Sequence, residues 1–178
     1  MILVVYAHPY PARSRACAAL VEAVRAREDV EVRSLYDLYP DFDIDGDAER
    51  AALAKADLVV LLHPLYWYSA PALLKHWFDH VLIKGWAHGA GNELAGKDCL
   101  WVTTTGGGED AFTPAGRHGR EFQAFVAPVE QTVRYCGMNW LAPFSVNGAH
   151  EVAPEALREA GAKLRARLDE WSAPPSHA

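Results

Sequence analysis

This sequence has little of several features that mark other classes of protein. Basic residues are few: 17 Lys and Arg stand against 23 Asp and Glu, a formal net charge of −6. Because sequence-independent binding of DNA or RNA needs a basic face, we expect no nucleic-acid partner. No apolar run approaches the roughly 18 residues of a transmembrane helix. The start MILVVYAHP lacks the basic segment of a signal peptide, so we expect a cytoplasmic protein.

Cysteine is also scarce, and its spacing does not suit a metal site. Cys17, Cys99 and Cys136 are far apart and form no CxxC pair or Cys/His ligand pattern, so we interpret them as buried, reduced thiols. The 13 glycines and 11 prolines are scattered without period, which excludes collagen-like and low-complexity chains. The whole chain of 178 residues is 51% hydrophobic and 22% charged, a profile typical of one globular domain.

Short apolar runs alternate with amphipathic stretches along the whole chain. The apolar runs suit strands buried on both faces of a parallel sheet, and the alternating run at residues 30–34 suits an edge strand. Strands are expected at residues 2–6, 30–34, 58–62, 99–103 and 140–146. Helices are expected from an N-cap at Ser14 to near residue 28, and at residues 48–56, 70–82, 122–136 and 155–171.

This alternation predicts a doubly wound α/β fold of the flavodoxin-like type, with a five-stranded parallel sheet in the order 2-1-3-4-5. We expect a single domain over residues 1–172 and a disordered tail over residues 173–178. In such folds the ligand binds beyond the carboxyl ends of the strands, where the strand order reverses. Three loops leave those ends, at residues 7–14, 63–69 and 104–118.

The first of these loops has no glycine, so it is neither a Walker loop nor a GxGxxG turn. It leads from a buried strand into the start of a helix, where free N–H groups and the helix dipole attract a phosphate. Ser14 can donate its hydroxyl, and His8, Arg13 or Arg15 can add charge. The alternative is that Ser14 only caps the helix and the arginines are solvated, and the local pattern leaves both readings open.

The other two loops carry aromatic and glycine residues. Three consecutive aromatics at residues 66–68 suit the walls of a pocket for a flat ring, or else cover the core at the strand end. Three glycines at residues 106–108 allow close approach of the backbone to a ligand, or form a flexible turn. The absence of GK[ST] after them disfavours ATP hydrolysis. His118 follows on a segment that can fold over the site.

Together these segments resemble the flavodoxin-like NAD(P)H:quinone reductases, which include the DT-diaphorases and their bacterial relatives. The resemblance lies in the AHP that ends the first strand, the Ser at the first helix, and the segments HPLYWYSAPALLKHWFD, GWAHG, TTTGGGED and YCGMNWL. The segment LYDLYPDFDID and the compact length look closer still to the ancillary flavoproteins of glutathione-gated potassium-efflux systems. The resemblance extends to about residue 172.

This resemblance implies an FMN cofactor that takes hydride from NAD(P)H and passes two electrons to a quinone in a ping-pong cycle. N–H donors near the N1/O2 edge would stabilise the anionic reduced flavin. By the resemblance, the phosphate and ribityl residues are His8, Ser14, Arg15, Ala16 and Cys17, the ring residues are Leu65, Tyr66, Trp67 and Tyr68, and the N1/O2 residues are Thr105, Gly106, Gly107 and Gly108.

The chain departs from the pattern of that family at two positions. His118 corresponds to the diaphorase histidine that handles charge beside the flavin, and it is the implied catalytic residue. The tyrosine that diaphorases carry six residues earlier is Phe112 here, so no phenol can share a proton relay. His118 therefore either handles charge or only shapes the pocket. Tyr66 stands where many relatives carry Gln, which alters the pocket wall.

The resemblance also implies partners. The Trp77, Phe78 and Val81 face of a helix either packs against the sheet or meets a second subunit. Because the relatives are dimers, we favour a homodimer that uses this face, with Trp86 reaching the partner's site. A potassium-efflux channel subunit would hold the protein at the cytoplasmic face of the membrane. Two alternatives to an enzyme with this double role stay open: a purely regulatory channel-binding subunit, and a flavodoxin-like electron carrier. The sequence does not decide between NADH and NADPH.

Two patterns resemble metal sites, but we expect no bound metal. The segment DFDIDG at residues 41–46 matches the opening of a calcium loop, yet the twelfth position is Ala52 rather than Glu. Its acidic residues are better interpreted as caps of the following helix. His76 and His80 have a spacing that zinc can use, but no third ligand is evident.

Overall fold

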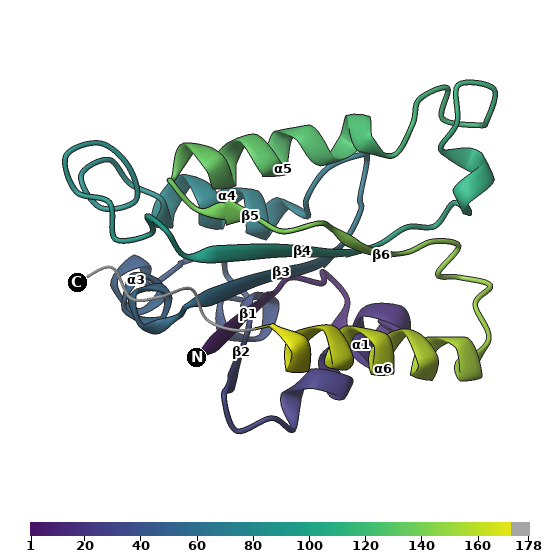
Figure 1. The fold of residues 1–178 in the computed structure, drawn as a ribbon, viewed down its shortest axis with the longest axis horizontal. Coiled ribbons are helices and arrows are strands. Elements are labelled where there is room, and N and C mark those ends of the chain that lie inside the picture. The colour runs from purple at the N-terminus through teal and green to yellow at the C-terminus, as the bar shows by residue number, and fades with distance from the viewer. Residues whose placement is uncertain (172–178) are drawn as a thin grey trace.

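The apolar runs of the sequence form one parallel sheet in the computed structural model, which describes residues 1–171 (Figure 1). β1 (Ile2–Tyr6), β3 (Leu58–Pro64) and β4 (Asp98–Thr104) occupy its centre, and every residue in these strands is buried. β2 (Val30–Ser34) forms one edge and is half-buried throughout, as its alternating sequence predicts. The order β2-β1-β3-β4-β5 confirms the flavodoxin-like prediction.

The other edge differs from the prediction of a single strand over residues 140–146. Two short strands, β5 (Asn139–Trp140) and β6 (Phe144–Val146), both pair in parallel with β4. Pro143 lies between them, and proline has no N–H to donate to a strand ladder. Pairing resumes at Val102 and continues to Thr104, so β6 ends level with β4 and delivers the next loop to the carboxyl edge of the sheet.

Helices cover both faces of the sheet (Figure 1). Alternate strand residues face opposite layers: Ile2 and Val4 pack with one helix group, Leu3 and Val5 with the other. One layer contains α1 (Ala16–Arg25) and α6 (Pro154–Glu170), and the other contains α3 (Gly46–Lys55), α4 (Ala72–Val81) and α5 (Gln123–Tyr135). The short elements are α2 (Leu35–Leu38) and the 3₁₀ turns η1 (Pro11–Arg13) and η2 (Glu109–Ala111).

Several predicted boundaries are corrected by the structure. α1 ends at Arg25, before residue 28, and Ser14 lies one residue before the N-cap, although its Oγ accepts a hydrogen bond from the Ala18 N–H at 3.1 Å. α3 begins at Gly46, because Asp45 is its N-cap and accepts from the Ala48 N–H at 2.9 Å. This supports the interpretation of the acidic segment as a helix cap. α4 and α5 are shorter than predicted by one or two residues at their ends, and α6 has the predicted length but begins and ends one residue earlier.

A buried carboxylate joins the elements of the second helix layer. Glu49 on α3 is fully buried and accepts hydrogen bonds from Arg33 Nε at 2.7 Å, Tyr39 Oη at 2.7 Å and Trp77 Nε1 at 2.8 Å. Trp77 and Val81 are both core residues, so the favoured prediction that they face a second subunit is wrong and the alternative, burial within the chain, holds. Of that group only Phe78 stays half-buried.

The structure also bears on the smaller predictions. The three cysteines are free and buried, as interpreted from their spacing. Within residues 1–171, no group of three His, Cys, Asp or Glu side chains is placed to hold a metal ion. Among those residues, no helix has both the length and the apolar character to span a membrane. The predicted disordered tail, residues 173–178, lies outside the described residues, as does residue 172.

Candidate functional site

Two adjoining cavities lie at the carboxyl edge of the sheet, where the loops after β1, β3, β4 and β6 meet. The first, of about 90 Å³, is lined by these predicted residues: His8, Ser14, Arg15, Ala16, Cys17, Leu65, Tyr66, Thr105 and Gly106. The second, of about 210 Å³, is lined by these: Leu65, Trp67, Tyr68, Thr105, Gly106, Gly107 and His118. Of the predicted site residues, Gly108 alone lines neither. The cavities share Leu65, Thr105 and Gly106, so one elongated ligand could occupy both.

The first cavity contains the start of α1. Among residues 1–171, none accepts a hydrogen bond from the backbone N–H groups of Arg15, Ala16 and Cys17. Unpaired N–H groups in the first turn of a helix, together with the positive end of its dipole, bind anions. Ser14 Oγ accepts a hydrogen bond from the Ala18 N–H, and a hydroxyl that accepts can also donate its own O–H. Ser14 thus acts as a cap and can also serve as a ligand.

His8 faces the same cavity as a hydrogen-bond donor. The Tyr10 N–H donates to His8 Nδ1 at 3.1 Å, so the neutral ring carries its proton on Nε2. Burial lowers the pKa of His8, because desolvation disfavours the charged ring. Arg13 lines the cavity as well and supplies a permanent positive charge near the helix start.

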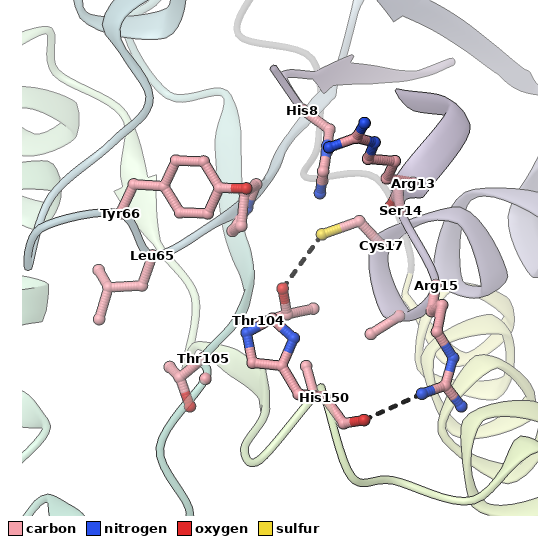
Figure 2. Close-up of a pocket in the computed structure, with 14 residues that line it drawn as sticks. His8, Arg13, Ser14, Arg15, Cys17, Leu65, Tyr66, Thr104, Thr105 and His150 are labelled. Carbon is pink, nitrogen blue, oxygen red and sulfur yellow. Dashed lines mark hydrogen bonds between the residues drawn. The ribbon is translucent and has the colours of Figure 1, made fainter. Parts of the chain in front are cut away.

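Cys17 lines the first cavity, with its sulfur directed at Thr104 (Figure 2). Its Sγ lies 3.2 Å from Thr104 Oγ1, and burial raises its pKa to about 11. A thiol with so high a pKa stays protonated at neutral pH and is a poor nucleophile. Cys17 therefore contributes packing and a weak hydrogen bond rather than covalent chemistry.

Arg15 does not direct its guanidinium at the cavity centre. Nη1 donates to the His150 carbonyl and Nη2 to the Val152 carbonyl, each at 3.0 Å. These bonds fasten the loop between β6 and α6, residues 147–153, beside the start of α1 (Figure 2). The loop places Ala149 and His150 in the lining of the first cavity. Sequence reasoning missed both residues. The available signal was that the last parallel strand also ends at this edge.

The aromatic loop forms a tight hairpin turn at the mouth of the second cavity. Tyr66 and Ser69 exchange two backbone hydrogen bonds, each 3.0 Å long. Between them Trp67 and Tyr68 have φ values of 49° and 65°, as in a type I′ turn, which favours Asn and Gly. Trp67 is 91% exposed. The turn holds these aromatic side chains in a conformation that few non-glycine residues adopt.

The second cavity is completed by the glycines and the loop that follows them. None of residues 1–171 accepts a hydrogen bond from the N–H groups of Gly106, Gly107 or Gly108. A Cβ on Gly107 would lie 3.0 Å from His118 Nε2, and one on Gly106 3.3 Å from the His150 ring. A ligand edge can therefore approach this backbone only because side chains are missing there.

His118 packs among aromatic rings. Its ring centroid lies 4.6 Å from that of Phe112 and 5.4 Å from that of Tyr68. Phe112 is buried and also contacts Phe122 and Phe125 edge-on, so it packs the interior of this loop. The structure thus brings His118 to the cavity as predicted, with an apolar ring where a phenol would stand.

His63 supports the site from below and was expected in the loop, but it lies within β3. The buried ring accepts a hydrogen bond from Trp101 Nε1 at 2.6 Å and donates from Nδ1 to the Pro64 carbonyl at 2.9 Å. Burial lowers its pKa to about 4, so the ring is neutral at physiological pH. This link joins β3 to β4 directly beneath the aromatic loop.

The whole arrangement suits a ligand with an anionic end and a flat ring. Free N–H groups at the start of α1 match an anion, and the aromatic turn with the glycine backbone matches a ring that has a polar edge. Both sets of groups line the same pair of adjoining cavities.

Comparison with known proteins agrees with this geometry. The sequence profile of the Flavodoxin_2 family, described as a flavodoxin-like fold, matches residues 1–168. The glutathione-regulated potassium-efflux system ancillary protein KefF of Klebsiella aerogenes is 48% identical over 172 residues, which cover 96% of this chain and 96% of that protein.

Solved structures show the same fold. The general stress protein 14 of Treponema denticola, in complex with FMN, superposes with a TM-score of 0.90 at 31% identity over 94% of this chain and 97% of that one. An NADPH-quinone reductase from P. pentosaceus gives 0.87 at 27% identity over 97% and 99%. A structure named as a tryptophan halogenase from Streptomycin violaceusniger gives 0.91 at 31% identity over 96% and 99%. Since such different names accompany one fold, the reaction must be argued from the site.

Proposed function

Because the chain belongs to the Flavodoxin_2 family of flavodoxin-like proteins, we propose that it is an FMN-dependent NAD(P)H:quinone oxidoreductase. The observation that carries the proposal is the pair of joined cavities, with unpaired N–H groups at the helix start in one and along the glycines beside the other. An anion-binding end and a ring-binding end in this order match a flavin mononucleotide. The FMN complex of the Treponema denticola relative and the NADPH-quinone reductase from P. pentosaceus support this proposal.

The phosphate would bind at the start of α1. Several donors that line this cavity would bind it: the free N–H groups of Arg15, Ala16 and Cys17, the Ser14 hydroxyl and the Nε2–H of His8. Charge-assisted bonds of this kind are shorter and stronger than neutral ones, so this end supplies much of the affinity.

The isoalloxazine would lie between the aromatic turn and the glycine backbone. Among residues 1–171, none accepts from the N–H groups of Trp67 and Tyr68, which can meet the N5 and O4 edge of the ring. The glycine N–H groups meet the opposite, N1/O2 edge, where they stabilise negative charge. When bound, FMN supplies the two-electron chemistry: it accepts hydride from NAD(P)H and passes two electrons to a quinone, which takes up two protons.

Tyr68 and His118 would border the space that NAD(P)H and quinone occupy in turn. Tyr68 stacks on Phe125 at 5.1 Å and meets the His118 ring edge-on, so its position is fixed before any ligand arrives. With Phe112 in place of a tyrosine, His118 would handle charge alone or shape the pocket. Because NAD(P)H and quinone would use the same face of the flavin in turn, the proposed cycle is ping-pong.

The visible absorption spectrum of the purified protein tests this proposal. We expect a flavin spectrum that bleaches on anaerobic addition of NADPH and recovers when menadione is added. A protein that retains no flavin, even after FMN is supplied and the excess removed, contradicts the proposal. Rapid bleaching distinguishes the enzyme from a flavodoxin-like electron carrier, which NADPH would reduce slowly. Repeating the titration with NADH gives the preferred donor.

A second role is favoured by the similarity to KefF along nearly the full length of both chains. We propose that this single-domain, cytoplasmic protein also acts as an ancillary subunit of a glutathione-gated potassium-efflux channel, as a homodimer at the membrane's cytoplasmic face. Potassium efflux from vesicles containing that channel, measured with and without the protein, tests this role. Efflux that does not change contradicts it. If a variant without bound flavin still activates the channel, the role is purely regulatory.

A further inference from the structure

The loop at residues 147–153 is tied to the site more tightly than a surface connection needs to be. The Gly148 N–H donates to the Gly107 carbonyl and the Ala149 N–H to the Thr105 carbonyl, both at 2.8 Å. Thr105 Oγ1 also lies 3.0 Å from Asn147 Oδ1. These bonds fix the first half of the loop against the glycine segment.

Arg15 fixes the second half of the loop. Its guanidinium spans the carbonyls of His150 and Val152, so the two bonds bracket residue 151 and hold the backbone on both sides of it. The planar fork of arginine can make two such bonds at once, which the single ammonium of lysine cannot reproduce. By holding the backbone at this point, Arg15 positions the side chain of His150.

The His150 ring projects into the phosphate end of the site. It lines the first cavity and stands beside Gly106, where a Cβ would meet its Cδ2 and Nε2 at 3.3 Å. In the view of Figure 2, His8 and His150 reach toward the cavity from opposite sides, with Cys17 and Thr104 between them. No residue within 1–171 forms a hydrogen bond with the His150 ring, so its N–H is available to a ligand.

We propose that His150 is a further phosphate-binding residue, which donates a hydrogen bond to the phosphate from the side opposite His8, and that Arg15 is the positioning residue that holds it there. This inference rests on the proposed function, because the ligand is the phosphate monoester of FMN. It changes the role predicted for Arg15, whose guanidinium acts through the loop while its backbone N–H faces the anion. The pair makes the site discriminate FMN from riboflavin, which lacks the phosphate.

Binding of both flavins to the FMN-stripped, full-length protein tests this proposal, with quenching of flavin fluorescence as the signal. We expect His150→Ala to weaken FMN binding about tenfold, the size of one charge-assisted hydrogen bond, and to leave riboflavin binding unchanged within about twofold. Arg15→Lys should weaken FMN binding about threefold to tenfold through the displaced loop. His76→Ala, which replaces an exposed histidine on α4, is the matched control and should change neither.

The double variant separates positioning from direct contact. If Arg15 acts only through His150, Arg15→Lys combined with His150→Ala binds FMN no more weakly than His150→Ala alone. Additive losses would show that the Arg15 guanidinium contacts the phosphate itself, which overturns the positioning role. Thermal unfolding of each variant without flavin, which should match the wild type, excludes a general loss of structure.

The remaining outcomes distinguish this proposal from the function beneath it. Wild-type protein that binds neither flavin overturns the proposed function. Wild-type protein that binds FMN tightly while His150→Ala binds it equally well overturns the role of His150 alone. An equal loss of affinity for FMN and for riboflavin in His150→Ala would place His150 against the ring or ribityl chain. That outcome also overturns the proposal.

Discussion

Two polar regions of this molecule satisfy their hydrogen-bonding groups in opposite ways. Around Glu49, the groups that face the fully buried carboxylate are paired with it: Arg33, Tyr39 and Trp77 all donate to it. At the carboxyl edge of the sheet, two runs of backbone N–H groups, at residues 15–17 and 106–108, donate to none of residues 1–171. Unpaired donors cost stability unless water or a ligand meets them. The first region stabilises the fold, and the second is held ready for a ligand.

Removing the buried carboxylate should have the largest effect and should fall on stability alone. Glu49→Ala removes the buried carboxylate that Arg33, Tyr39 and Trp77 share, and breaking a buried pair from one side costs about 3–5 kcal/mol. We expect that loss in the free energy of unfolding, measured by urea denaturation. The matched control is Glu159→Ala, which removes an exposed partner of Lys163 and should cause no measurable change. An equally stable Glu49→Ala variant would show that the paired region does not stabilise the fold.

The buried hydrogen bond between Trp101 and His63, beneath the aromatic loop, predicts that the stability of the fold depends on pH. The folded pKa of His63, about 4, lies below its ordinary value of 6.5, so only the unfolded chain takes up the proton between these values. The contribution of the neutral His63 ring to the free energy of unfolding should be fully present above pH 6.5. It should fall by about 3 kcal/mol as the pH drops to 4. Urea denaturation across this range, compared with His63→Gln, measures the contribution. An unchanged slope in His63→Gln would assign the acid sensitivity to other groups.

The smallest effect on stability is expected at the carboxyl edge of the sheet, where the backbone N–H groups are unpaired. Gly107→Ala places a Cβ 3.0 Å from His118 Nε2 and 3.1 Å from the Ala111 Cβ, in the space that a ligand edge needs. Crowding of this size costs about 1–3 kcal/mol, which we expect to appear as a tenfold or greater loss of FMN affinity. The free energy of unfolding without ligand should change by less than about 1 kcal/mol. A large loss of stability with unchanged FMN affinity would reverse the contrast between the two regions.

Much of the fold could be predicted because it depends on local patterns. The apolar runs that became β1, β3 and β4 can be buried only on both faces of a sheet, and this fixes the class of fold. The split of the last strand at Pro143 was also visible in principle, since a proline within a strand run interrupts pairing.

The site was predicted only in part. Local sequence placed the aromatic turn, the glycines and the start of the first helix, since each follows a buried strand. It could not place His150, because that residue reaches the cavity through the pairing of β6 with β4 and the bonds from Arg15, which is 135 positions away. Trp77 was misassigned for a similar reason: its partner Glu49 lies 28 positions earlier, on another helix. Contacts between distant segments leave no periodic pattern.

The exposed turn at the mouth of the second cavity has a practical consequence. Trp67 is 91% exposed, whereas Trp77 and Trp101 are almost completely buried. Its indole emission should therefore be red-shifted and open to quenching by iodide, while that of the two buried residues is not. Any molecule that settles against the turn will shield this one fluorophore. The protein thus carries a natural optical reporter at the entrance to its site, and occupancy can be followed without attaching a label.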